Sequence, residues 1–419
     1  MKRLLNLPKN IYLTYFGIFI LRLFFYFSLA ILQNPKYMQV TSLERVLIFV
    51  PYPAAELLTV SFFGSLCDKI GRKPIFVTSF VLDGLAIFFY SLTKSPVLLP
   101  IISALFGMGA AASVTSSLVM IADLSPQDLH GSTMGIYDAM ALAGLGGGFV
   151  GGFILMEVAP NYAHLGFVLG GVILFIMAVF SYFKIEETFK PEEIEGGNQG
   201  FVKALIDDIV AVLKDKDVQH ILPVWIPVIC LYGIMLNFSE QLAHDLELTK
   251  EGLPLLIVLA SIGLAIFIGF PLHGFLSDKF GRKPFLIIGM FSFAAFISLL
   301  VYASATNQLL TFAVPLFIFG LGCGAFPPAA LALLADISEK ERAGATMGSY
   351  SVVYGIGLLL GPFLAGIILD KKIPYVPKEY QGITGLVILV WLLGLISIIG
   401  TLYLPPHLSQ SHKHEKTTN

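Results

Sequence analysis

Long apolar segments recur along almost the whole chain, and short polar segments separate them. A helix that crosses a membrane needs about 20 mainly apolar residues, and twelve segments meet this requirement. The pattern therefore predicts an all-α membrane protein with twelve transmembrane helices. The expected spans cover about 11–32, 46–67, 74–94, 97–122, 133–156, 162–184, 221–243, 253–277, 284–305, 309–335, 346–370 and 382–404.

A polar segment divides these spans into two groups of six. It follows Lys184 and contains EETFKPEEIEGGNQG, whose charges and glycines are typical of a linker. We therefore expect four parts in the chain. They are a helical bundle over 1–184, a cytoplasmic linker over 185–220, a second bundle over 221–404 and a cytoplasmic tail over 405–419.

The composition supports a membrane protein. Charged residues make up 13% of the chain and hydrophobic residues 56%, whereas a soluble domain carries roughly 25% charged residues. The net charge of -2 gives no indication of a nucleic-acid partner. The three cysteines lie alone in apolar segments, so we expect neither a metal site nor a cofactor. The first apolar segment is too long for a signal peptide and is expected to remain as the first span.

Lysine and arginine are unevenly distributed between the two sides of the membrane. With the N-terminus inside, the inner segments hold roughly 18 of these residues and the outer segments roughly seven. Because basic residues stay on the cytoplasmic side, we expect both termini in the cytoplasm. The compact loops suggest a multi-pass protein of a prokaryotic plasma membrane.

Two motifs occur once in each half of the chain. GSLCDKIGRKP begins at Gly64 and GFLSDKFGRKP at Gly274, while ADLSPQDLHGSTMG begins at Ala122 and ADISEKERAGATMG at Ala335. Both pairs are displaced by about 210 residues, which indicates an internal duplication. Two copies of six spans enter the membrane with the same polarity, so an axis along the membrane normal can relate them.

The repeated loop closely resembles the signature loop of the major facilitator superfamily, which lies between the second and third and between the eighth and ninth helices. The resemblance extends over nearly the whole chain. It implies the major facilitator fold, with two pseudo-symmetric six-helix bundles around a central cavity that opens alternately to each side. It also implies secondary transport.

The resemblance further implies that the charged residues of these loops form a cytoplasmic gate. The aspartate of each loop could accept hydrogen bonds from a neighbouring helix start, and each arginine could pair with an aspartate at the end of the fourth or tenth span. The glycine of each loop would permit a tight turn. Alternatively, the basic residues only set the topology. The expected gate residues are Asp68, Gly71, Arg72, Asp123, Asp278, Gly281, Arg282 and Asp336.

The fifth and eleventh spans are rich in glycine. Each glycine costs a helix about 1 kcal/mol relative to alanine, but it allows close approach of a neighbouring helix. The eleventh span is similar to a glycine–proline motif of antiporters in the family, although that motif normally lies in the fifth span. The expected packing residues are Gly147, Gly148, Gly151, Gly152, Gly357, Gly361 and Pro362.

Charged residues inside the spans are the best indication of a functional site. Each costs roughly 2.5–3.5 kcal/mol in mid-membrane and therefore needs a partner or a water-filled cavity. Arg22 and Glu56 have opposite charge at similar depth, so we predict that they pair, either for function or to hold two helices together. Asp83 lies in a span that the family places at the periphery, which favours packing or a capping hydrogen bond. The expected substrate or proton pathway comprises Arg22, Tyr26, Glu56, Asp138, Asn237 and Glu240.

These features together predict secondary active transport of a small organic solute by alternating access, coupled to protons. Efflux of amphiphilic drugs and uptake of sugars or organic acids both remain open, as does a gradient-independent uniporter. Many drug exporters of the family carry an arginine four residues before a glycine in the fourth span, but here Ser103 precedes Gly107. A non-transporting sensor is less favoured. No nucleophile–base pair or phosphate-binding loop suggests an enzyme. The expected partners are the substrate, protons and the lipid bilayer, and we expect a monomer.

Overall fold

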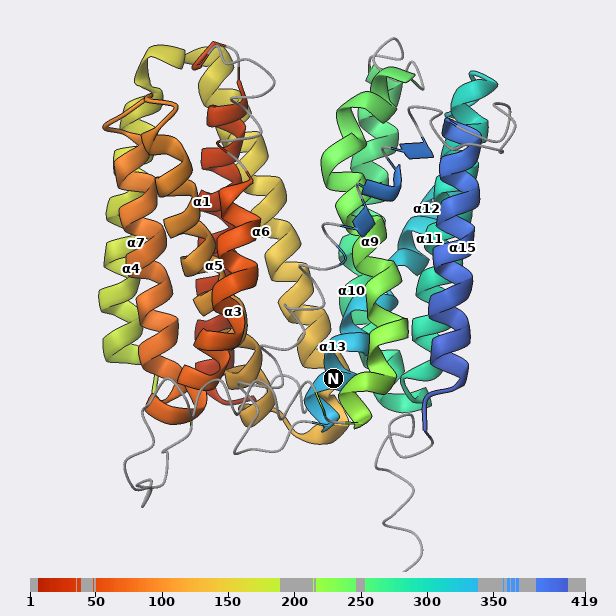
Figure 1. Ribbon diagram of the computed structural model, residues 1–419, viewed down its shortest axis with the longest axis horizontal. Coiled ribbons are helices and arrows are strands. Elements are labelled where there is room, and N and C mark those ends of the chain that lie inside the picture. Colours follow the sequence, from red (N-terminus) through yellow and green to blue (C-terminus); the bar gives the residue numbers. More distant parts are fainter. Residues whose placement is uncertain are drawn as a thin grey trace, which may run out of the picture. The chain divides into compact units, whose positions relative to one another are not determined.

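The described part of the chain forms long helices in a computed structural model (Figure 1). The structure describes residues 7–34, 36–38, 48, 50–188, 214, 216–245, 253–337, 357, 360–361, 363–365, 367–368 and 382–405. For 217–218, 235–245, 253–260 and 337 it describes the backbone alone.

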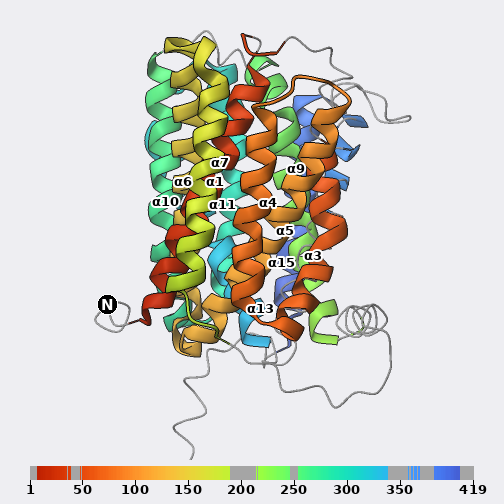
Figure 2. The ribbon, with the colours of Figure 1, turned by 90° about the vertical axis from the view of Figure 1, so that its left-hand side faces the viewer.

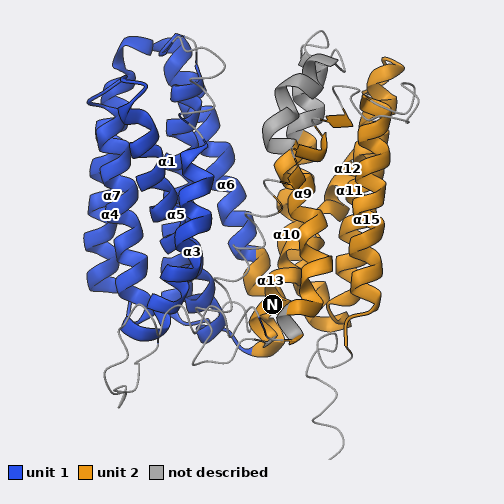
Figure 3. Cartoon of the chain, viewed as in Figure 1, with its two compact units in different colours: residues 1–126, 136–214, 338–352 blue, residues 127–135, 215–337, 353–419 orange. Residues whose placement is uncertain are grey.

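The chain divides into two compact units (Figure 3). The first contains 1–126, 136–214 and 338–352, and the second contains 127–135, 215–337 and 353–419. The units therefore do not separate only at the linker, because the short segment 127–135 belongs to the second unit.

Unit 1 is built around α5, an almost wholly buried helix. Its helices are α1 (Lys9–Gln33), α3 (Pro51–Ile70), α4 (Arg72–Tyr90), α5 (Leu98–Leu124), most of α6 (His130–Val158) and α7 (Ala163–Lys184). Helices α1, α3 and α4 all contact α5, and α4 and α7 lie side by side (Figure 2). Because α5 is apolar on all sides, it is suited to a fully enclosed position.

The outer surface of unit 1 is apolar. Leu169, Val172, Ile176 and Phe183 of α7 are all exposed. In water such a surface would be unfavourable, whereas lipid chains match it. This side of α7 therefore suits the bilayer.

Unit 2 is also helical. Its helices are α9 (Lys216–Asp245), α10 (Leu253–Phe280), α11 (Lys283–Ala305), α12 (Ala313–Cys323), α13 (Phe326–Ile337) and α15 (Ile383–Leu402). Helix α9 packs on α15, and α12 lies between α10 and α11. The span expected over about 309–335 is present as the apolar segment Ala313–Asp336, in which a turn at Gly324 and Ala325 separates α12 from α13. Pro327 and Pro328 follow this turn and cannot donate backbone hydrogen bonds to the preceding turn.

Membrane-spanning helices account for most of the described chain. Within the described residues, nine helical segments are long and apolar enough to cross a membrane. The expected spans over about 46–67 and 221–243 correspond to α3 and α9, which are helical but not among these nine. Most of the expected span over 346–370 lies outside the described residues. The all-α membrane architecture is thus present.

Candidate functional site

A cluster of charged and tyrosine side chains lies inside unit 1. Arg22 of α1 and Glu56 of α3 interact electrostatically. They form no direct ion pair in the described structure, and a tyrosine lies close to each of them: Tyr52 to Glu56 and Tyr137 to Arg22. The predicted pairing therefore does not take the form of a direct ion pair, and the two charges interact over a longer distance.

Aromatic rings surround the two charges. Phe25 follows Arg22 by about one helical turn, and its ring stacks on Tyr52 with centroids 4.7 Å apart. It also meets Phe106 edge-on at 5.1 Å. The predicted pathway residue Tyr26 is buried and contacts the ring of Phe149 at 5.3 Å. The charges thus lie beside an aromatic surface.

Asp83 of α4 belongs to the same cluster. It interacts electrostatically with both Arg22 and Glu56, and its side chain lies against Gly109 of α5. Sequence analysis gave Asp83 a packing or capping role and no place in this cluster. The depth of a residue along a helix can be read from the sequence, but the direction in which its side chain faces cannot. The Oδ1 atom of Asp83 has no hydrogen-bond partner among the described residues, so the contact with Gly109 agrees with the packing alternative.

The other predicted pathway residues lie apart from this cluster or outside the described side chains. Asp138 of α6 is half-buried, and its Oδ2 atom has no partner within the described part of the chain. The side chains of Asn237 and Glu240 lie outside the description, although both residues are in α9. Their roles remain predictions.

Glycines of α6 bring this helix close to α1. A side chain at Gly148 would collide with the backbone at Leu23 and Phe27, and one at Gly152 would collide with Phe27 and Ala30. Of the four packing glycines predicted in α6, only Gly148 and Gly152 lie so close to α1 that an added side chain would collide with it. The other two, Gly147 and Gly151, would meet ordinary van der Waals contacts. Sequence analysis missed Gly144, which lies directly against Arg22 and Leu23.

The glycines predicted to pack in the eleventh span contact α9. Gly357 lies against Ile229, and Gly361 lies against the backbone of Cys230. A larger side chain at either position would force these segments apart. Pro362 lies outside the described residues.

The first signature loop forms a buried ion-pair network. Arg72 is 0% exposed. Its Nη2 atom lies 3.1 Å from Asp68, its Nε atom lies 3.2 Å from Asp123, and its Nη1 atom donates to the Cys67 carbonyl at 2.9 Å. The predicted pairing of Arg72 with Asp123 is therefore present. Gly71 ends α3 with a φ of 101°, the left-handed conformation for which glycine was predicted.

Glu187 caps the start of α4, a contact that sequence analysis missed. Its carboxylate accepts hydrogen bonds from the backbone N–H groups of Arg72 at 2.9 Å and Lys73 at 3.1 Å. Such a carboxylate satisfies free N–H groups and interacts favourably with the helix dipole. The sequence feature that could have predicted this contact is the pair of adjacent glutamates directly after the sixth span.

The second signature loop repeats the arginine network. Arg282 Nε lies 3.2 Å from Asp336 Oδ2, which is the predicted pair. Arg282 Nη1 also lies 2.6 Å from Asp278 Oδ1, a pair that was not predicted. Burial alone would lower the pKa of Arg282, but Asp336 and Asp278 raise it above its ordinary value. Gly281 has a φ of 89°, so it also adopts the left-handed conformation.

Asp278 binds the start of α6, which belongs to unit 2. Its Oδ1 atom accepts from the Gly131 N–H at 2.7 Å, and its Oδ2 atom accepts from the Ser132 N–H at 2.7 Å and the Ser132 hydroxyl at 2.5 Å. His130 Nδ1 lies 2.8 Å from Asp336. Asp278 thus accepts hydrogen bonds from a helix start, as predicted.

Removing the buried arginine of the first loop should destabilise the protein strongly. Arg72→Ala would leave two aspartates without their cation, at a cost of about 3–5 kcal/mol. Lys36 provides a matched exposed cation, because its 2.7 Å ion pair with Glu157 leaves these side chains 50% and 46% exposed. Lys36→Ala should cost at most about 1 kcal/mol. Thermal unfolding in detergent measures both, and equal losses would contradict the buried network.

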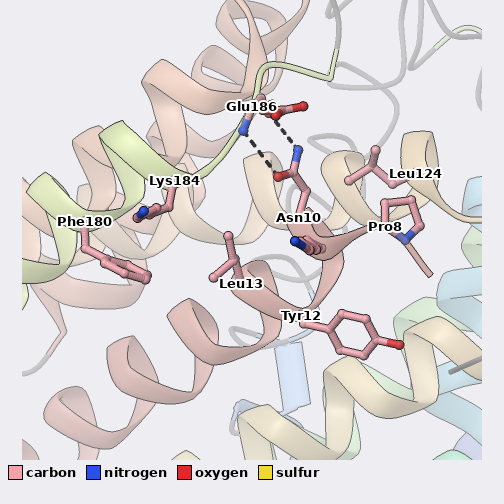
Figure 4. Close-up of a pocket in the computed structure, with 9 residues that line it drawn as sticks. Pro8, Asn10, Tyr12, Leu13, Leu124, Phe180, Lys184 and Glu186 are labelled. Atoms are coloured by element: carbon pink, nitrogen blue, oxygen red, sulfur yellow. Dashed lines mark hydrogen bonds between the residues drawn. The ribbon is translucent and has the colours of Figure 1, made fainter. Parts of the chain in front are cut away.

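A pocket of about 650 Å³ lies at the ends of α1, α5 and α7, away from the charge cluster (Figure 4). The side chain of Asn10 bonds the backbone of Glu186 at its edge, with distances of 3.1 and 3.3 Å. Arg22 is twelve residues further along α1, or about 18 Å at 1.5 Å per residue. The pocket therefore gives no access to Arg22.

Comparison with known proteins places these features in a family. The sequence profile of the Major Facilitator Superfamily matches residues 11–241 and 228–418. The chain belongs to the major facilitator superfamily. Membership identifies it as a membrane transporter rather than an enzyme, and it agrees with the predicted fold.

Relatives and a solved structure support this assignment. Multidrug resistance protein 2 of Bacillus subtilis (strain 168) is 25% identical over 380 residues, which cover 88% of this chain and 89% of that protein. Multidrug resistance protein 3 of the same organism is 37% identical over 114 residues, but these cover 27% of this chain and 22% of that protein. The human organic anion transporter TETRAN has a similar fold, with a TM-score of 0.74, 14% identity and coverage of 93% and 100%.

Proposed function

We propose that this major facilitator protein is a proton-coupled exporter of amphiphilic organic compounds. The observation that carries the proposal is the buried cluster of Arg22 and Glu56 beside an aromatic surface in unit 1. Two relatives are named multidrug resistance proteins, which supports export of drug-like compounds over uptake of sugars.

The chemistry of Glu56 suits proton coupling. A carboxylate in an apolar interior is unfavourable unless a cation balances it or a proton neutralises it. Arg22 supplies the cation, and Tyr52 lies close to the carboxyl group. Glu56 can therefore exist in two forms, and a substrate that weakens its interaction with Arg22 would favour the protonated form.

The aromatic surface and the carboxylates favour an amphiphilic cation as substrate. Rings of Phe25, Tyr52 and Phe106 offer apolar area and attract cations through their faces. Uptake of an organic anion is the second candidate, because Arg22 would then bind the substrate directly.

The signature loops would act as the cytoplasmic gate. Their charges form hydrogen bonds at the ends of helices, where a modest change in geometry breaks several bonds together. Rupture and re-formation of such networks gives two discrete states, as alternating access requires. We further propose a monomer in the plasma membrane with both termini in the cytoplasm.

Transport in proteoliposomes with an imposed pH gradient tests the proposal. The wild type should move a cationic dye faster with the gradient than without it, and Glu56→Gln should lose this dependence. Glu157→Gln is the matched control, because Glu157 is an exposed carboxylate and its variant should keep the dependence. Gradient-independent transport by wild type and both variants would indicate a uniporter instead.

A further inference from the structure

Three charged side chains lie at similar depth in unit 1 and interact electrostatically. The backbone of α3 at Tyr52 and Glu56 lies directly against Gly107 of α5, and Asp83 of α4 lies against Gly109. Residues 107 and 109 differ in height by only about 3 Å along the helix. The glycines thus hold Glu56 and Asp83 at the same depth.

Arg22 reaches this level from α1. It interacts electrostatically with Glu56 and with Asp83. Phe25, about one turn further along α1, contacts Phe106, the residue next to Gly107. One cation therefore serves two carboxyl groups that come from different helices.

Asp83 is poorly solvated. Its residue is 3% exposed, and its Oδ1 atom has no hydrogen-bond partner among the described residues. The titratable groups that face it are Arg22, Glu56, Tyr52 and Tyr90. The Tyr90 hydroxyl is instead bonded to Ser103 at 2.9 Å, so it does not satisfy Asp83.

The charges of this cluster do not balance if both carboxyl groups are ionised. Two carboxylates and one guanidinium would leave one uncompensated negative charge in an apolar interior, which is strongly unfavourable. One proton restores neutrality, and interacting carboxyl groups take up such a proton as a pair. We propose that Glu56 and Asp83 share one proton beside Arg22 and together form the proton-binding site of this transporter.

This inference deepens the proposed proton coupling and rests on it for its biological meaning. When an amphiphilic cation enters beside the pair, its charge replaces that of the proton. The O–H bond of the protonated carboxyl group then breaks, the proton passes to water, and both carboxylates remain balanced by two cations. Departure of the substrate cation restores the proton. Exchange of one cation for one proton follows directly from this charge balance.

Infrared spectroscopy of the purified, substrate-free protein tests the shared proton without any transport assay. A protonated carboxyl group has a C=O stretching band that disappears on ionisation. The shared proton predicts that this band is lost in Asp83→Asn and equally in Glu56→Gln, because the remaining carboxylate then pairs alone with Arg22. Arg22→Gln should gain a second such band, since both carboxyl groups must then be neutral. Asp138→Asn, which removes a carboxyl group outside this cluster, should keep the band of the pair.

Each result has a definite meaning. Loss of the band in Asp83→Asn but not in Glu56→Gln would show that Asp83 holds its own proton, and this would overturn the sharing. No loss in either variant would show that the cluster is fully ionised and would also overturn it. If one of these two variants fails to fold, the other still tests the pair, because a band that persists in it would overturn the sharing. The wild type could hold the shared proton and yet show no gradient-driven transport. That result would refute the proposed function but would leave the proton-binding site in place.

Discussion

Arg22→Gln is expected to abolish gradient-driven transport while the protein still folds. Loss of the guanidinium leaves Glu56 and Asp83 without their cation. An uncompensated buried charge costs about 3–5 kcal/mol, so both carboxyl groups should take up protons and retain them. Groups that cannot release protons cannot couple them to a substrate. Transport of a cationic dye in proteoliposomes should therefore fall to the level of empty liposomes.

Arg22→Lys is the control for this prediction. Lysine keeps a positive charge at the same position but cannot reproduce the planar guanidinium that lies beside Tyr137. Partial gradient-driven transport is expected in this variant. Transport at the wild-type rate in Arg22→Gln would contradict a role for Arg22 in coupling.

Asp278→Ala is expected to release the start of α6 from α10. The variant loses three hydrogen bonds from Gly131 and Ser132 and the ion pair with Arg282. Hydrogen bonds to a charged group contribute about 1.5–3 kcal/mol each, so the loss is large. Hydrogen–deuterium exchange at the amides of Gly131 and Ser132 should accelerate by at least about tenfold, which corresponds to 1.4 kcal/mol.

Asp278→Asn is the control for this prediction, because it removes the negative charge but keeps the size and shape of the side chain. The amide retains one oxygen that can accept from a backbone N–H, so exchange should lie between that of wild type and that of Asp278→Ala. Exchange at the wild-type rate in both variants would show that Asp278 does not hold the start of α6.

The sequence predicts features that depend on position along one helix. Apolar length fixes the spans, and the duplicated loop places Arg282 close to Asp336 in the same way that it places Arg72 close to Asp123. The left-handed turn at Gly71 follows from a motif in which a side chain would be strained. These predictions need no knowledge of how the helices rotate.

Features that depend on helix rotation and on close packing are harder to predict. Asp83 joins the charge cluster because Gly109 lets α4 approach α5, and one sequence does not show which face of α4 meets that glycine. The tyrosines that lie beside Glu56 and Arg22 are two among 16 in the chain. Sequence alone does not indicate which of them lie within reach of a charge.

Simultaneous measurement of proton and substrate movement tests the central claim most directly. Proteoliposomes that contain a pH-sensitive dye are given a cationic substrate, and the internal pH is followed. The wild type should move protons opposite to the substrate, whereas Glu56→Gln should exchange labelled for unlabelled substrate without moving protons. Substrate movement without any proton movement in the wild type would contradict coupling through Arg22 and Glu56.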